Sequence, residues 1–335
     1  MKKAVLIFSL FVLTTTSVLS QQSDFPKLTG PYLGQNPPKM TPEIFASGII
    51  SLGFHEHSLT ISPDGKEIFF VSASSNFSKY LIMYTWLEKD EWSMPIVAPF
   101  SGVYLDLSPS FSPDGKRLYF ASIRPLTETE EPKKDFDIWF VERENGGWSE
   151  PKNVGSPINT YGNEVSPAFM SDGSMAFQYI EKLGSLTWDL YISHFSDGKY
   201  SPPEKYPSPI NTEFNEAAPY IVQDGSYILF NSNRPHGQGI MSIFVSFKNE
   251  DGSWNEPINL REKFFSNPLC GDWGPVISPD GKYIFFSSFR NNDPIEPKSE
   301  KYFEQMEELL GVPLPGKGTL YWIDIGILEE YRPID

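Results

Sequence analysis

The stretch Ser278-Pro279-Asp280-Gly281-Lys282, with alternating apolar residues on both sides of it, decides the fold. Residues 62–66 and 112–116 repeat it letter for letter, and residues 171–173 and 223–225 repeat its Asp-Gly core. An Asp-Gly pair between two alternating apolar runs predicts a hairpin turn, because Gly adopts positive φ without steric cost. Five copies spaced by 50 to 58 residues therefore indicate one supersecondary unit that is used five times.

The residues on either side of each turn Asp follow one pattern. An acid stands eight residues before it, a small residue six before it, and an apolar residue three before it. These positions predict a short strand, and alternating pairs after the turn, such as Ile284 and Phe286, predict a second. Third strands are expected at 81–85, 137–141, 189–193, 243–246 and 320–324. In four copies a Trp or Tyr, two residues and a Pro then open a fourth, outer strand, since Pro is tolerated where an edge strand begins.

Four strands per unit predict an all-β fold, a single five-bladed β-propeller of four-stranded blades within residues 41–335. The fifth copy lacks a fourth strand, so we expect residues around 42–49 to supply it and to close the ring. Residues 299–310 predict a short helical insertion in blade 5, with Ser299 as N-cap and Gly311 at its end. This helix either forms a lid or wall beside the channel mouth, or covers blade surface.

The N-terminus has the pattern of a signal peptide over residues 1–20. Lys2 and Lys3 precede an apolar run that is too short to span a bilayer, and small residues precede a cleavage site near Ser20. We therefore expect an exported protein, periplasmic or extracellular, with residues 21–40 as an N-terminal extension. Cys270 is the only cysteine, which excludes an intrachain disulfide.

Charge and missing motifs exclude several classes of function. Cleavage would remove two lysines and no acid, so the formal charge falls from −16 to −18, which argues against nucleic acid as a partner. No later apolar run is long enough for membrane insertion, and we expect a monomer. The sequence has no Gly-x-Ser-x-Gly elbow, phosphate loop or His-Glu-x-x-His motif. We predict no cofactor and no metal site, with a divalent cation in the channel as the open alternative.

The repeats resemble a known family. The Ser-Pro-Asp-Gly-Lys copies, with Phe-Ala-Ser-Ile-Arg at 120–124 and Phe-Asn-Ser-Asn-Arg at 230–234, are similar to the TolB-like Pro-Asp propeller repeats, which are distant relatives of WD repeats. The resemblance covers nearly the whole mature chain and implies the propeller fold. It also implies a range of functions: periplasmic scaffolds for protein partners, sensor domains, and carbohydrate-active or peptidase-associated propellers. We expect no counterpart of the separate α/β domain of TolB, since the first motif begins near Glu56.

Strand direction places two sets of charged residues on the face opposite the Asp-Gly turns. The acids are Glu56, Asp106, Glu164, Glu216 and Asp272, and ten residues after the turn Asp stand Arg124, Arg234 and Arg290, with Ser74 and Lys182 in the other two copies. An acid and an arginine can pair across a blade, or the acid can accept backbone N–H groups at the start of the blade. Alternatively, five carboxylates around a channel bind a cation or a polar ligand.

Two copies depart from the pattern near the channel mouth. The first has His55-Glu56-His57, and alternation along a strand places both histidines on one side and Glu56 on the other. The fifth has Trp273, which either stacks on a sugar ring or fills a gap between blades. Together with Arg124, Arg234 and Arg290, these residues are our candidates for ligand binding.

Two functions remain open from the sequence. The first is an exported, non-catalytic binding module that recognises a protein, peptide or glycan at the acidic channel-mouth face. The second is a carbohydrate-active enzyme, a glycoside hydrolase or lyase, that uses the five acids with His57 and Arg234 assisting. Carboxylates about 5 to 9.5 Å apart and unpaired in an open pocket would favour the enzyme, whereas acids already paired with arginine or backbone would argue against it.

Overall fold

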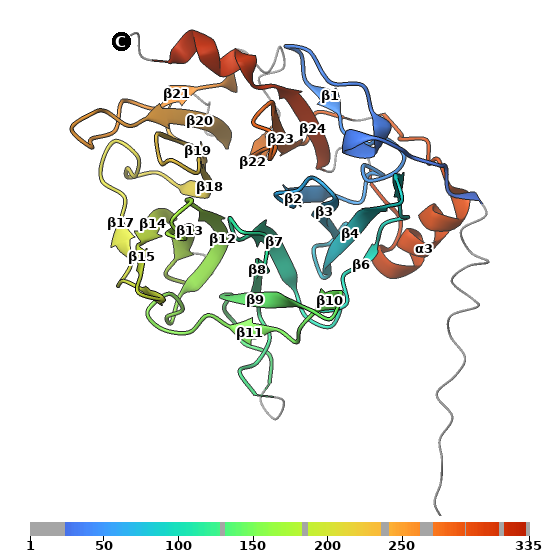
Figure 1. Ribbon diagram of the computed structural model, residues 1–335, viewed down its shortest axis with the longest axis horizontal. Coiled ribbons are helices and arrows are strands. Elements are labelled where there is room, and N and C mark those ends of the chain that lie inside the picture. Colours follow the sequence, from blue (N-terminus) through green and yellow to red (C-terminus); the bar gives the residue numbers. More distant parts are fainter. Residues whose placement is uncertain are drawn as a thin grey trace, which may run out of the picture.

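Five four-stranded β-sheets surround a central axis as the blades of a propeller, which confirms the predicted fold class (Figure 1). The computed structural model describes residues 24–127, 131–182, 187–235, 241–261, 271–291, 293–314 and 318–332. The predicted signal peptide and Cys270 lie outside these residues. No helix in the described part of the chain is long and apolar enough to cross a membrane.

The blades follow one another along the chain, and the strands of each run in order from the axis outward. Blade 1 contains β2 (Glu56–Ile61), β3 (Glu67–Ala73), β4 (Tyr80–Glu88) and β6 (Ile96–Val97); blade 2 contains β7 (Asp106–Phe111), β8 (Arg117–Ser122), β9 (Asp137–Glu144) and β11 (Lys152–Asn153); blade 3 contains β12 (Asn163–Phe169), β13 (Met175–Ile180), β14 (Asp189–Ser193) and β17 (Glu204–Lys205); blade 4 contains β18 (Glu216–Ile221), β19 (Tyr227–Ser232), β20 (Ser242–Phe247) and β21 (Ile258–Asn259); blade 5 contains β22 (Asp272–Ile277), β23 (Tyr283–Ser288), β24 (Thr319–Asp324) and β1 (Glu43–Ile44). Short strands β5 (Glu91–Trp92), β10 (Gly147–Trp148), β15 (Phe195–Ser196) and β16 (Lys199–Tyr200) form small hairpins beside three of the blades.

The recurrent Ser-Pro-Asp-Gly-Lys turn has a hydrogen-bonding cause. The hydroxyl of Ser278 donates to the Asp280 carboxylate (2.6 Å) and accepts the backbone N–H groups of Lys282 (3.1 Å) and Tyr283 (3.0 Å). Ser62 and Ser112 likewise donate to the turn Asp and accept from the backbone in their own turns. The serine and the aspartate together satisfy the backbone donors that the tight turn leaves unpaired.

Each inner strand contains a β-bulge near the axis. The register against the second strand shifts in all five blades, between residues such as His57 and Thr60 in blade 1. The bulge residue is the small residue of the repeat and has φ between 44° and 61°: Ser58, Ser108, Ser166, Ala218 and Gly274. The pattern of small residues thus has a backbone reason, because a left-handed conformation disfavours large and β-branched side chains.

The N-terminal strand closes the ring as predicted. Strand β1 pairs with β24 through Glu43 opposite Trp322, and in Figure 1 it forms the outer edge of blade 5. Phe45, fully buried, packs between Phe285 (4.9 Å between ring centroids) and Trp322 (5.2 Å). The same apolar cluster continues into blade 1 through Phe70 and other residues, so the two ends of the chain are joined by a continuous core.

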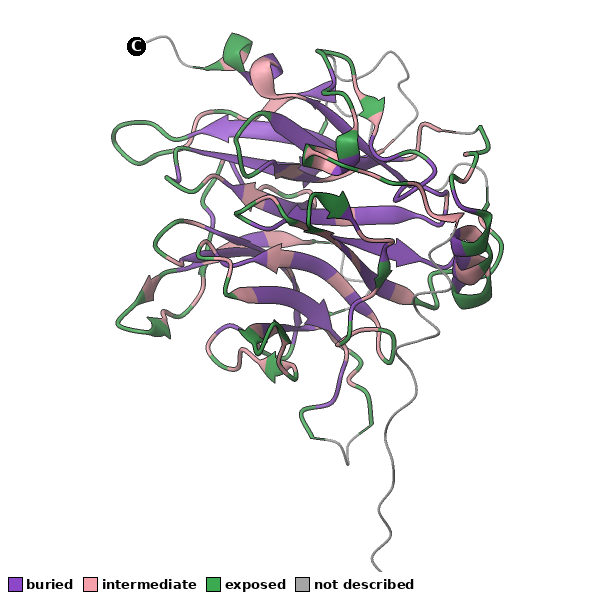
Figure 2. Cartoon of the chain, turned by 45° about the vertical axis from the view of Figure 1, so that its right-hand side comes forward, coloured by how far each residue is buried: buried purple, intermediate pink, exposed green. Residues whose placement is uncertain are grey.

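Helix α3 (Glu300–Leu310) confirms the predicted insertion, with Ser299 as N-cap accepting from the Tyr302 N–H. Its buried face of Tyr302, Met306 and Leu310 packs on the cluster shared by blades 5 and 1. Figure 1 shows the helix at the outer margin of the ring, so it covers blade surface. Figure 2 shows that buried residues concentrate in the strands, whereas the connections are mostly exposed.

Candidate functional site

The five acids of the repeat lie inside the structure at the start of each inner strand. Four have no exposed surface and Asp272 is 2% exposed. In four blades the carboxylate accepts hydrogen bonds from residues two to five positions earlier, in the connection that enters the blade. The donors are the N–H groups of Leu52 and Phe54 for Glu56, Ser101 for Asp106, Thr160 for Glu164, and Thr212 for Glu216. The acids therefore hold the connections between blades.

The arginines ten residues after the turn Asp are the partners of three of these acids. Arg124 contacts Asp106 at 2.8 Å, Arg234 contacts Glu216 at 3.1 Å, and Arg290 contacts Asp272 at 2.7 Å. Each guanidinium also lies over aromatic rings of its own blade, as Arg234 does over Phe230 and Phe244. The negative charge predicted at the channel mouth is therefore neutralised in these three blades, because each carboxylate pairs with the arginine of its own blade.

The two copies without arginine have different electrostatics. Glu56 accepts backbone N–H groups, and Glu164 accepts a hydrogen bond from Thr160 (2.6 Å) while its Oε2 is buried without a partner. Burial raises the pKa of both carboxyls to about 7. Burial also raises the pKa of Asp272 to about 6, although Arg290 opposes the shift.

A funnel opens on the face of these acids and is lined mainly by blades 1, 2, 3 and 5, with Met241 from blade 4. Its volume is about 620 Å³, and the lining is mainly aromatic and apolar. Rings come from Phe77 and Tyr80 in blade 1, Phe136 in blade 2, Trp188 in blade 3, and Trp273 and Phe289 in blade 5. Trp188 meets Trp273 edge to face with 6.2 Å between ring centroids. Of the predicted ligand-binding residues, His55, His57 and Trp273 line the funnel, whereas the three arginines do not.

Sequence reasoning missed most of the ring side chains, although a recurrent position could have found them. Large residues stand at or just before the start of the third strand in four blades: Tyr80, Phe136, Trp188 and Met241. Blade 5 has Gly318 there. A Cβ on Gly318 would lie 2.7 Å from His55 Nδ1 and 2.8 Å from Ser287 Oγ, so the glycine leaves room for a polar patch in the aromatic wall.

His55 and His57 form this polar patch together with Ser287. Their ring centroids lie 5.1 Å apart, as alternation along the strand predicts. His55 Nδ1 accepts the backbone N–H of Gly318 (2.9 Å), which fixes His55 as the neutral tautomer with its proton on Nε2. His57 Nδ1 contacts Ser58 Oγ (2.8 Å), while His57 Nε2 and Ser287 Oγ are buried without a hydrogen-bond partner. Burial holds the pKa of His57 well below its usual value, so this ring is also neutral.

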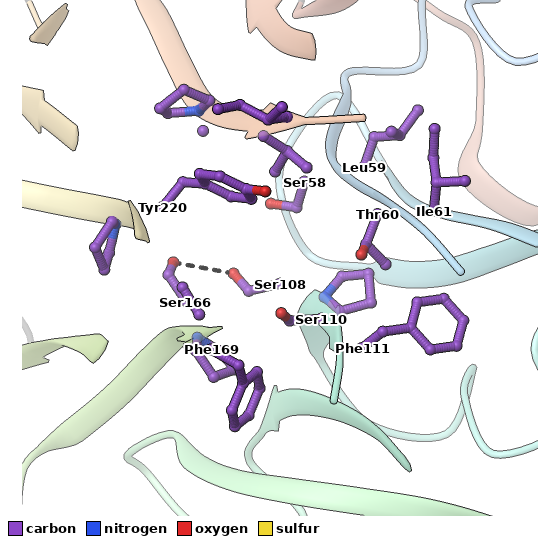
Figure 3. A pocket seen from close by; sticks show the side chains of 18 of the residues that line it. Ser58, Leu59, Thr60, Ile61, Ser108, Ser110, Phe111, Ser166, Phe169 and Tyr220 are labelled. Carbon is purple, nitrogen blue, oxygen red and sulfur yellow. Dashed lines mark hydrogen bonds between the residues drawn. The ribbon is translucent and has the colours of Figure 1, made fainter. Parts of the chain in front are cut away.

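The funnel narrows to the ring of bulge residues at the axis. Ser58, Ser108 and Ser166 border both the funnel and a second cavity of about 170 Å³ on the turn side. Figure 3 shows this cavity, with Ser108 and Ser166 hydrogen-bonded to each other (3.2 Å) and Phe111, Phe169 and Tyr220 around it. The floor of the funnel is therefore a group of hydroxyls, in contrast to its aromatic wall.

A metal site is not evident in the described part of the chain. No three His, Cys, Asp or Glu side chains are grouped there so that they could hold an ion. The ring acids form hydrogen bonds within their own blades. Among the described residues we therefore find no set of ligands for the alternative of a cation in the channel.

No family model and no curated protein matches this chain. Solved structures do match. They include a protein assigned as TolB in Agrobacterium tumefaciens (20% identity, 70% of this chain and 69% of that chain, TM-score 0.44) and the endo-arabinase of Bacteroides thetaiotaomicron (16%, 73% and 92%, 0.45). They also include the periplasmic gluconolactonase PpgL of Pseudomonas aeruginosa (14%, 69% and 64%, 0.37).

Proposed function

We propose that this chain is a non-catalytic binding propeller that takes part of its ligand into the aromatic funnel. The observation that carries the proposal is the funnel itself. Its volume is about 620 Å³, ring side chains from four blades line it, and two of its lining residues have a buried polar atom without a partner. A pocket of this size, mainly apolar with a few convergent polar groups, has the usual form of a ligand site. With residues 1–20 predicted as a signal peptide, we place this role outside the cytoplasm.

The state of the acids favours binding over glycoside hydrolysis. A catalytic carboxylate must reach the scissile bond, and one of the pair must be available as acid while the other acts as base or nucleophile. Asp106, Glu216 and Asp272 are instead paired with arginine, and Glu56 binds backbone N–H groups. Asp272 is the one ring acid that lines the funnel, and its carboxylate is 2.7 Å from Arg290.

The proposal is tested by removing one funnel ring. Labelled protein without residues 1–20 is applied to a glycan array and to a peptide array, and hits are titrated in solution. Trp273→Ala should weaken binding at least roughly tenfold, since truncating a central aromatic anchor typically costs about 2 kcal/mol or more. Trp86→Ala is the matched control, because Trp86 lines a groove on the turn side. Equal affinities of the two variants for every hit would contradict the proposal.

A further inference from the structure

The funnel wall presents no unpaired charge among its described residues. Asp272, the one carboxylate among them, is neutralised by Arg290, and the hydrogen bond to His55 and the burial of His57 keep both histidines neutral. A charged group that entered the funnel would lose its hydration without gaining a countercharge, which is costly in a mainly apolar site. The funnel therefore favours an uncharged group.

The funnel nevertheless offers hydrogen bonds at defined places. His57 and Ser287 line one wall, and their Nε2 and Oγ atoms are buried and have no hydrogen-bond partner. The hydroxyls of Ser58, Ser108 and Ser166 form the floor. Buried polar atoms without partners are rare in folded proteins, because each costs about 1 to 3 kcal/mol. A wholly apolar ligand would leave His57 Nε2 and Ser287 Oγ unpaired, so the site favours a ligand that carries hydroxyl or amide groups on the side that faces them.

Flat apolar surfaces complete the site. Trp188 and Trp273 meet edge to face, and Phe77, 40% exposed at the rim, stacks on Tyr80 with 6.2 Å between ring centroids. Such surfaces bind a ring that has an apolar face. A neutral sugar ring has all three properties: it is uncharged, has an apolar face and carries hydroxyls on its edge.

We propose that the funnel binds a neutral sugar unit of a glycan, with its apolar face on Trp273 and its hydroxyl edge toward His57, Ser287 and the serine floor. This assignment rests on the proposed binding function and names its ligand class. An uncharged peptide with an aromatic side chain is the competing ligand, and it is an outcome of the test.

Intrinsic tryptophan fluorescence is titrated with three probe sets: neutral oligosaccharides from hexose and pentose polymers, oligosaccharides of equal length that contain uronic acids, and uncharged peptides with one Tyr or Phe. We expect neutral oligosaccharides to bind and the acidic ones to bind at least roughly tenfold more weakly, because the funnel offers the carboxylate no countercharge. The affinity of the neutral set should stay within about twofold between roughly 0.05 and 0.5 M NaCl, since no ion pair forms.

Ser287→Ala provides the sharpest variant. It removes an unpaired buried hydroxyl and almost no volume, so the fold should be at least as stable as before, while sugar affinity should fall roughly two- to tenfold through one lost hydrogen bond. Ser72→Ala is the matched control, because Ser72 Oγ is also buried and unpaired in the second strand of its blade but does not line the funnel.

Three results would overturn the sugar assignment: no neutral oligosaccharide binds, acidic ones bind as well as neutral ones, or Ser287→Ala and Ser72→Ala have equal sugar affinity. If only peptides bind and Trp273→Ala abolishes that binding, the sugar assignment fails and the funnel remains the binding site. If ligands bind with no effect of Trp273→Ala, the proposed function itself fails.

Discussion

The buried carboxyl at the start of each inner strand occupies the same position in all five blades, but only three of the blades provide it with an arginine partner. In blades 2, 4 and 5 it is neutralised by an arginine just after the second strand, whereas in blades 1 and 3 Ser74 and Lys182 stand at that place. Glu164 is the extreme case, since one of its oxygens has no partner and Asp137 and Lys133 act on it in opposite directions. Burial raises the pKa of Glu56 and Glu164, the two acids without an arginine partner, to about 7.

Glu164 should make the stability of the protein depend on pH. Burial raises its pKa to about 7 from the ordinary value of 4.5, so the folded protein keeps a proton that the unfolded chain releases between these values. The stabilisation is complete below pH 4.5 and is lost as the pH rises through 7. Glu164→Gln removes this dependence, and the variant should gain up to about 3 kcal/mol relative to the wild type as the pH rises from about 4.5 to about 8.

Urea unfolding at a series of pH values measures this difference. Glu216→Gln is the comparison, because it leaves the Arg234 guanidinium buried beside a neutral group and should lose about 3 kcal/mol across the whole range. Parallel stability curves of the wild type and Glu164→Gln would show that the pKa of Glu164 is the same in the folded and unfolded protein.

The inner strands owe their shape to the bulge rather than to crowding alone. The bulge residue turns each strand where the five blades converge. Two bulge residues also donate a backbone hydrogen bond to a side chain of the preceding blade: the Ala218 N–H to Gln178 (3.2 Å) and the Gly274 N–H to Asn231 (2.8 Å). The bulge therefore creates both the narrow floor of the funnel and a direct bond between neighbouring blades.

The backbone strain of the bulge can be measured by adding a side chain at Gly274 and by removing one at Ala218. No atom lies within 4 Å of a Cβ built on Gly274, so Gly274→Val tests conformation with little steric collision at that atom. At a φ of 61°, it should lose about 1 to 3 kcal/mol of unfolding free energy. Ala218→Gly, at a φ of 44°, should be neutral or gain up to about 1 kcal/mol, because relief of strain exceeds the added entropy of Gly.

Thermal and urea unfolding of both variants give the result. A Gly274→Val protein as stable as the wild type would mean that the left-handed backbone does not select the small residue at this position.

The sequence predicts the fold of the molecule better than it predicts the candidate binding site. The turn at Asp280 and the intervals between its copies predict five blades, their strand order and the closing strand, because these depend on local chemistry that recurs in every repeat. The site depends on residues that differ between blades and meet only in three dimensions. His57 and Trp273 could be found because they break the repeat. Trp188 and Phe136 share the position directly before the third strand, but the sequence pattern does not show that side chains at this position turn inward.

Ring closure should hold the whole propeller together. Residues 24–49 cross from blade 1, where Trp92 donates to the carbonyls of Leu28 and Gly30, to blade 5, where Phe45 is buried. Phe45→Ala should lower the unfolding free energy by about 3 to 5 kcal/mol, as expected for a fully buried Phe. Phe77→Ala, at a ring 40% exposed, should lose much less. Urea unfolding of the two variants measures the difference, and equal losses would mean that the closing segment contributes little.

Closure itself is tested with a chain that begins at residue 50 and a synthetic peptide of residues 24–49. Without the peptide, blade 5 has an open edge at β24 and blade 1 loses the cover over Trp92, so unfolding should begin at lower urea concentration. Adding the peptide should raise the midpoint progressively with its concentration, because it binds only the folded ring. The peptide with Phe45→Ala should raise the unfolding midpoint to the same value only at a much higher peptide concentration. A truncated chain as stable as the full one would mean that the blade interfaces alone, without the closing strand, hold the ring.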